Sequence, residues 1–146
     1  MPQRIQRKRT AGWRMPEGAV YVGRPSRWGN PFQPIGRELV GAGNAWRIDC
    51  GTADNALRES VSLFRDIASG FWNPNRVEPL DDAHYRALMA QLKIWRQRIG
   101  GHPLEMAWAE LRGHDLACWC PLVDADGNHV PCHADVLLDL AAKGGI

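Results

Sequence analysis

Apolar residues recur every three or four positions through the middle of the chain, which is the spacing of one helix face. The pattern predicts helices over residues 54–69, 81–99 and 104–111. Gly70 follows the first of these helices and Gly100 follows the second, as is typical of helix C-termini. The middle of the chain is therefore expected to be helical.

Short runs of apolar and β-branched residues predict strands near the two ends of the chain. Residues 19–23 and 116–120 form the stronger runs, and residues 4–8 alternate more weakly around one isoleucine. Residues 35–52 lack a clear pattern and are expected to be mostly loop, with a short turn or strand around 45–48. The sheet is thus expected to be small.

The order of these elements predicts an α/β fold, a small single domain over residues 1–146 with a layered, Rossmann-like sheet and flanking helices. A last helix is expected over 134–143. In such folds ligands bind beyond the carboxyl ends of the strands. The loops 23–32 and 120–132 both leave predicted strands at that end, so they are expected to share one crevice if the two strands are parallel neighbours.

The composition is typical of a soluble globular protein, and we expect a cytoplasmic one. Of the 146 residues, 45% are hydrophobic and 23% are charged, and no apolar run approaches the ~20 residues that span a bilayer. Three of the four cysteines are clustered, which favours thiol or metal chemistry in a reducing compartment over a disulfide scaffold. No membrane partner is expected, and the oligomeric state stays open.

Charge is unevenly distributed along the chain. Residues 1–30 hold seven basic side chains against one acidic, a balance of +6, whereas residues 31–146 hold eleven basic against fifteen acidic, a balance of −4. A basic end on a mildly acidic body favours an anionic partner, either a nucleotide or a nucleic acid. The alternative is a solvated basic segment without a ligand.

Three cysteines and a histidine lie close together near the end of the chain. Cys118 and Cys120 are two positions apart in a predicted strand, so their side chains leave one face. Cys132 and His133 come directly before the last predicted helix, whose free N–H groups and dipole favour a thiolate at Cys132. A strand end and a helix start are therefore expected to present three sulfurs and an imidazole to one point.

This cluster has three interpretations. In the first, the cysteines are buried core residues. In the second, zinc or an iron–sulfur cluster is bound by Cys118, Cys120, Cys132 and His133. In the third, Cys132 or Cys120 is a catalytic nucleophile, and His133 and Asp135 assist proton transfer. A C-x-C pair is an unusual ligand spacing, and adjacent Cys132 and His133 are hard to aim at one ion. The sequence leaves all three interpretations open.

The loop after the second predicted strand carries side chains suited to a nucleotide. Arg24 and Arg27 offer guanidinium groups for phosphate. Trp28 offers an indole that stacks on a base, and Asn30 offers an amide for a base edge. The alternative is a structural loop in which Trp28 covers the core. The remaining tryptophans, Trp119 among them, are expected to pack rather than bind.

Both ends of the chain resemble a known family. Residues 21–32 read YVGRPSRWGNPF, residues 116–121 read LACWCP and residues 131–137 read PCHADVL. These motifs resemble DUF4326, an uncharacterised family found in bacteria and their phages. A fainter resemblance runs to DUF488, another uncharacterised family, which also has a cysteine-bearing strand followed by a Cys-His helix start. The acidic turn at 124–129 is longer here than in DUF4326. The resemblance implies one domain and no established activity.

Two functions fit these observations. The first is a small enzyme of nucleotide or nucleic-acid metabolism that binds a nucleotide or nucleobase and depends on a cysteine. The second is a non-catalytic nucleic-acid-binding accessory module, in which basic residues 4–14 follow the phosphate backbone and the cysteines are structural or bind zinc. Whether the protein is an enzyme stays open at this point.

Overall fold

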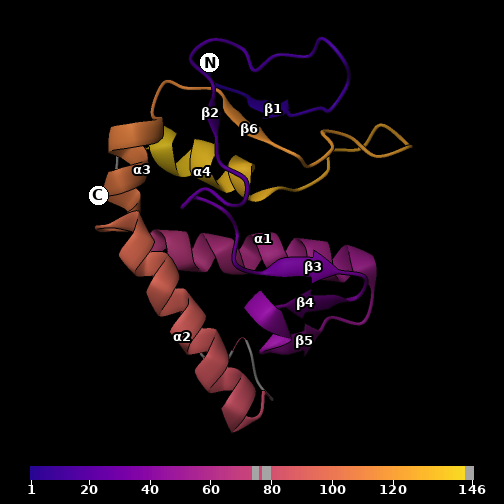
Figure 1. The fold of residues 1–146 in the computed structure, drawn as a ribbon, viewed down its shortest axis with the longest axis vertical. Helices are drawn as coiled ribbons and strands as arrows, with labels where there is room; N and C mark the ends of the chain where they lie inside the picture. Colours follow the sequence, from indigo (N-terminus) through magenta and orange to yellow (C-terminus); the bar gives the residue numbers. More distant parts are fainter. Residues whose placement is uncertain (74–75, 77–79, 144–146) are drawn as a thin grey trace.

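The computed structural model describes residues 1–73, 76 and 80–143. Within these residues the chain forms four α-helices and two three-stranded sheets. The helices are α1 (Ala53–Ser69), α2 (Asp82–Ile99), α3 (Pro103–Leu111) and α4 (His133–Ala142). Figure 1 shows α1 across the middle of the molecule, with one sheet and α4 on one side and the second sheet on the other.

The first sheet is parallel and joins the two ends of the chain. Its strands are β1 (Arg4–Gln6), β6 (Leu116–Cys118) and β2 (Val20–Tyr21), with β6 in the centre. All three residues of β6 are buried, as expected of a parallel strand covered on both faces. The prediction that the runs at 19–23 and 116–120 share a sheet is confirmed. Because β2 and β6 are parallel neighbours, the loops that follow them leave the same edge.

The second sheet is antiparallel and was missed by the sequence pattern. Its strands are β3 (Gln33–Ile35), β4 (Glu38–Val40) and β5 (Arg47–Asp49), in that spatial order. The prediction of loop over most of 35–52 is wrong here, although the short turn or strand expected around 45–48 overlaps β5. Strands of three residues are too short to show alternation, and the proline in β3 reads as a turn signal. Gly36, with a φ of 59°, forms the tight turn between β3 and β4.

Local sequence explains where the long helices begin and end. Thr52 caps α1, because its hydroxyl oxygen accepts a hydrogen bond from the Asn55 amide at 3.1 Å, and Gly70 ends the helix in the left-handed region. Asp81 and Gly100 cap α2 in the same way. The predicted helices are confirmed within one or two residues. The mixed α/β class is confirmed as well. The expected similarity to a Rossmann fold is not confirmed, because the chain forms two separate small sheets and not one doubly wound sheet.

Helix α1 connects the two halves of the fold. It contacts α4 and α3 on one side and β3 and β4 on the other. Phe64 is fully buried in α1 and packs edge-on against Trp95 of α2 and His133 of α4, with ring centroids 6.0 and 5.2 Å apart. Across the described parts of the chain, no helix is long and apolar enough to cross a membrane.

Candidate functional site

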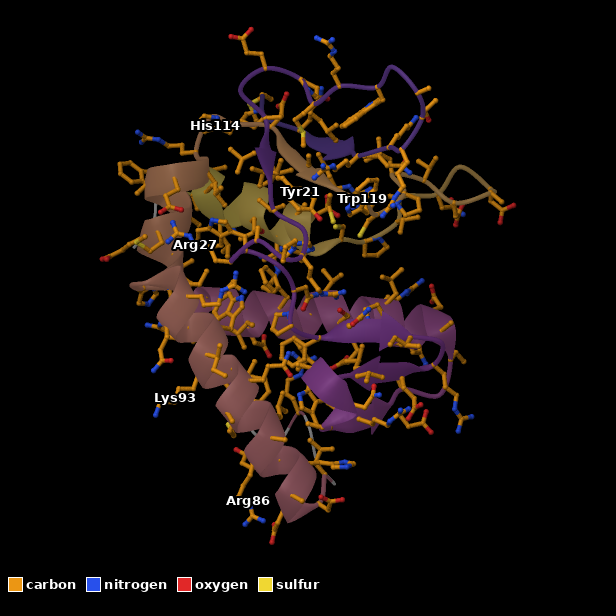
Figure 2. All side chains as sticks on the ribbon, viewed as in Figure 1. Tyr21, Arg27, Arg86, Lys93, His114 and Trp119 are labelled. Carbon is orange, nitrogen blue, oxygen red and sulfur yellow. The ribbon has the colours of Figure 1, made fainter. Side chains whose placement is uncertain are left out.

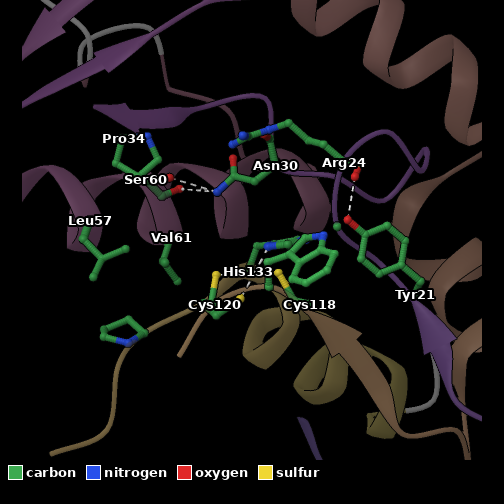
Figure 3. A pocket seen from close by; sticks show the side chains of 14 residues that line it. Tyr21, Arg24, Asn30, Pro34, Leu57, Ser60, Val61, Cys118, Cys120 and His133 are labelled. Atoms are coloured by element: carbon green, nitrogen blue, oxygen red, sulfur yellow. Dashed lines mark hydrogen bonds between the residues drawn. The ribbon is translucent and has the colours of Figure 1, made fainter. Parts of the chain in front are cut away.

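A cavity of about 180 Å³ lies at the edge of the parallel sheet where β2 and β6 end. Its walls come from the loop after β2, the end of β6, the start of α4 and one face of α1 (Figure 3). Residues that line it include Tyr21, Arg24, Asn30, Cys118, Cys120, Cys132 and His133. The structure thus brings together the two loops that the sequence analysis expected in one crevice.

The four side chains of the cysteine cluster converge on one point. The Sγ atoms of Cys118 and Cys120 are 3.6 Å apart, and the Cys132 Sγ lies 3.6 Å from the His133 Nδ1. The ligand atoms of Cys118, Cys132 and His133 all lie within 4.8 Å of one another, and the three residues are buried. All three cysteines are free thiols. The cluster is therefore a compact group of three sulfurs and one imidazole, as predicted.

A backbone contact fixes the proton on the His133 ring. The Nε2 atom lies 2.8 Å from the Val22 carbonyl oxygen. A carbonyl only accepts hydrogen bonds, so Nε2 is the donor and, in the neutral ring, Nδ1 keeps its lone pair. That lone pair faces the sulfur of Cys132. The edge-on contact with Phe64 holds the ring in this orientation.

The thiols of the cluster differ in acidity. The pKa of Cys118 is lowered because the thiols of Cys120 and Cys132 donate hydrogen bonds to its sulfur. The pKa of Cys120 is raised to about 11, first because its proton is held by Cys118. The pKa of Cys132 is raised for the same reason, with burial adding to it. The thiolate predicted at Cys132 from the sequence is disfavoured by this raised pKa, and the lowered pKa is that of Cys118.

Asp135 lies behind the cluster rather than in the cavity. Its Oδ2 accepts a hydrogen bond from the Cys132 backbone amide at 3.1 Å and pairs with the Arg4 Nη1 at 3.0 Å. The same oxygen is 2.9 Å from the His129 Nε2. Asp135 is at the third position of α4, where a carboxylate closes the helix N-terminus. In the structure it holds the cysteine loop against α4 and β1.

Arg24 is the cation of the cavity. Its Nε donates to the Asn30 carbonyl oxygen at 3.0 Å, and among the described residues no hydrogen bond is seen from its two Nη atoms. Burial lowers the pKa of this guanidinium, and the neighbouring sulfurs of Cys118 and Cys120 oppose that shift. The side chain therefore presents positive charge to the cavity beside the cysteine cluster.

The other three residues predicted to bind a nucleotide make contacts within the protein. Asn30 lines the cavity, but its Nδ2 donates to Ser60 Oγ at 2.9 Å and its Oδ1 accepts from the Phe32 amide at 2.9 Å. Trp28 is 3% exposed and belongs to the core. Arg27 forms an ion pair with Glu110 of α3 and lies beside α2 and α3 (Figure 2). Of the four, only Arg24 both lines the cavity and has side-chain donors without a partner among the described residues.

An exposed cluster of arginines and aromatic rings borders the cavity, and the sequence analysis missed it. The Arg7 guanidinium lies 4.7 Å from the Tyr21 ring and 5.0 Å from the Trp119 ring, and Arg9 lies 4.8 Å from the same indole. Trp119 is 38% exposed and lines the cavity, so it is not a core residue. The signal was its place between two inward-facing cysteines, which turns it outward.

Comparison with known proteins identifies a family whose function is described as unknown. The model of a family described as "Domain of unknown function (DUF4326)" matches residues 5–143, nearly the whole chain. No curated protein and no solved structure matches it. Function has to be inferred from the site itself.

Proposed function

We propose that this chain, which belongs to the DUF4326 family, binds a nucleotide or a nucleobase in the cavity between the loop after β2 and the cysteine cluster. The observation that carries this proposal is the Arg24 guanidinium at the cavity wall, with both Nη atoms directed to no described hydrogen-bond partner. A cation with free donors favours an anionic group, and a guanidinium suits phosphate or carboxylate geometry.

The size and lining of the cavity support part of a nucleotide as the ligand. At about 180 Å³ it is smaller than the ~300 Å³ at which sites for drug-sized ligands begin. Only a base or a phosphate group therefore enters, while the rest of the ligand lies over the rim. That rim carries Tyr21 and Trp119, aromatic side chains of the kind on which bases stack.

Arg24→Gln is expected to weaken nucleotide binding roughly 10- to 150-fold, because a charge-assisted hydrogen bond contributes about 1.5–3 kcal/mol. Isothermal titration against a panel of nucleobases, nucleosides and nucleoside mono- and triphosphates measures the effect. Arg37→Gln is the matched control, since this arginine is exposed in the second sheet and pairs with Asp49. An equal loss in both variants, or no binding by the unaltered protein, would refute the proposal.

A second candidate function is binding of single-stranded nucleic acid over the rim of the cavity. It is favoured by the exposed ring of Trp119 with Arg7 and Arg9 stacked around it. Aromatic faces that stack bases, combined with arginines that neutralise phosphates, are the features of sequence-tolerant single-strand binding. The basic balance of residues 1–30 adds to the attraction.

Trp119→Ala is expected to weaken binding of a labelled oligothymidylate roughly 5- to 150-fold, because stacking on one aromatic ring contributes about 1–3 kcal/mol. Affinity should also fall steeply between low and moderate salt. Fluorescence anisotropy measures both effects. Trp108→Ala is the control, because this indole also lies under an arginine, Arg112 at 3.8 Å, but on α3. Salt-independent binding or equal losses would contradict this function.

Cysteine-dependent catalysis stays a prediction. Cys120 and Cys132 line the cavity, so a bound ligand lies beside both thiols. The raised pKa values of these two thiols work against a thiolate, the nucleophilic form, at either of them, whereas the lowered pKa is that of Cys118, which is only 5% exposed. We therefore propose binding as the function of the cavity.

A further inference from the structure

We propose that Cys118, Cys120, Cys132 and His133 together bind one zinc ion, which forms the floor of the cavity. The inference is independent of which ligand the cavity takes. It starts from three sulfurs and one imidazole nitrogen gathered in a largely buried place, where unpaired polar groups are costly. Three of these ligand atoms already lie within 4.8 Å of one another, and the fourth, the Cys120 sulfur, is 3.6 Å from that of Cys118.

Two of the separations between these atoms match the edges of a tetrahedron around one zinc ion. Zn–S bonds of about 2.3 Å and tetrahedral angles put two sulfurs ~3.8 Å apart, and a Zn–N bond of about 2.0 Å puts sulfur and nitrogen ~3.5 Å apart. The Cys118–Cys120 pair, at 3.6 Å, and the Cys132–His133 pair, also at 3.6 Å, agree with these values. The ion therefore fits with small movements of the side chains.

The His133 ring is already prepared for a metal. Its Nε2 donates to the Val22 carbonyl oxygen at 2.8 Å, so the lone pair of the neutral ring is on Nδ1, the atom that faces the sulfurs. Metal-binding histidines commonly donate their second ring nitrogen to a carbonyl in this way, which fixes tautomer and orientation. The contact is between β2 and α4, so it also ties the site to the sheet.

The backbone conformation at the start of α4 allows the adjacent residues Cys132 and His133 to reach one ion. Cys132 is the N-cap of α4 and is extended, with φ −149° and ψ 150°, whereas His133 is the first helical residue. The chain changes direction between them, so both side chains reach the same point. Likewise β6 ends at Cys118, and the chain has left the strand before Cys120. The C-x-C pair is therefore not on a straight strand.

The donor set favours zinc over other metals. Three thiolates and an imidazole are soft to borderline ligands, which suit zinc and do not suit magnesium or calcium. An iron–sulfur cluster distributes its cysteines around two or more iron ions, whereas three of these ligand atoms lie within 4.8 Å of one another, close enough to share one ion. Four protein ligands close the coordination sphere, as in structural sites. The zinc would join β6 to the start of α4 and hold Cys118 and Cys120 in place beside Arg24.

The test uses the full chain purified under reducing conditions. Elemental analysis is expected to give one zinc per chain. Replacement by Co²⁺ should give thiolate charge-transfer bands and the intense visible bands of a tetrahedral site. Cys132→Ser should lose the metal, whereas Cys50→Ser should keep it, since Cys50 is the free cysteine outside the cluster. A chain without metal after reconstitution, an octahedral cobalt spectrum or an iron–sulfur chromophore would overturn the proposal.

A second measurement does not depend on the folding of a variant. In the unaltered protein, alkylation followed by mass mapping should modify Cys50 with or without a chelator, and Cys118, Cys120 and Cys132 only after the chelator is added. Reaction of the cluster thiols at rates that the chelator leaves unchanged would overturn the proposal. Arg24→Gln should keep its zinc, so failure of nucleotide binding and failure of metal binding are told apart.

Discussion

Arg4→Gln is expected to lower the free energy of unfolding by about 1.5–3 kcal/mol, because the charge-assisted hydrogen bonds of a buried guanidinium are lost. The Arg4 side chain is 5% exposed and pairs with Asp135 at 3.0 Å. Its Nη2 also donates to the carbonyl oxygens of Pro121 and Leu122, at 3.1 and 3.2 Å. One side chain of β1 thus holds both ends of the loop that carries the cysteines to α4.

Chemical denaturation followed by circular dichroism measures the effect of Arg4→Gln. Arg37→Gln serves as control, because its pair with Asp49 is exposed on both sides and such pairs contribute about 0–1 kcal/mol. The double variant with Asp135→Asn should lose less than the sum of the two single losses, since each removes the same contact. Equal stability of Arg4→Gln and Arg37→Gln would show that the buried Arg4 side chain does not hold the loop.

The sequence predicted the parts of the fold whose physics is local. Helices α1 and α2 have apolar faces, capping residues and terminal glycines within one continuous segment, so their limits are readable. The parallel sheet was also predictable, because β6 is an apolar run and β2 is rich in β-formers. The antiparallel sheet was not, since its three-residue strands owe their pairing to packing against α1 rather than to their own pattern.

The site was only half predictable for a related reason. Cys118, Cys120, Cys132 and His133 follow from their position at a strand end and a helix start, and the structure brings them together. Which loop residue faces the cavity depends on burial, which the local sequence does not encode. Arg24 lines the cavity while Trp28, four residues later, is in the core. The local sequence around an arginine or tryptophan in such a loop does not show whether its side chain faces the cavity or the core.

Adjacency in sequence is also a poor guide to metal geometry. Cys132 and His133 appeared hard to direct at one ion because neighbouring side chains in regular structure diverge. The change from extended backbone at Cys132 to helix at His133 removes that objection. Since this change occurs at a helix N-cap, a Cys-His pair directly before an apolar helix deserves a metal interpretation whenever two further cysteines end a neighbouring strand.

Phe64→Ala is expected to lower the free energy of unfolding by about 3–5 kcal/mol, the usual cost of removing a fully buried aromatic side chain and leaving a cavity. Phe64 lies at the junction of α1, α2 and α4, where its ring packs edge-on against Trp95 and His133. Its removal would open space directly behind the imidazole. The loss should therefore be accompanied by weaker zinc binding, because the His133 ring is then free to tilt away from the sulfurs.

Phe71→Ala is the matched control for this prediction, because Phe71 is 77% exposed and its loss should change stability by less than about 0.5 kcal/mol. Phe64→Leu keeps most of the volume and should cost less than Phe64→Ala. Denaturation midpoints give the stabilities, and competition with a zinc-binding dye gives the metal affinities. If Phe64→Ala is destabilised but keeps the zinc affinity of the unaltered protein, the ring of Phe64 supports the core alone, and His133 is held by its hydrogen bond to Val22.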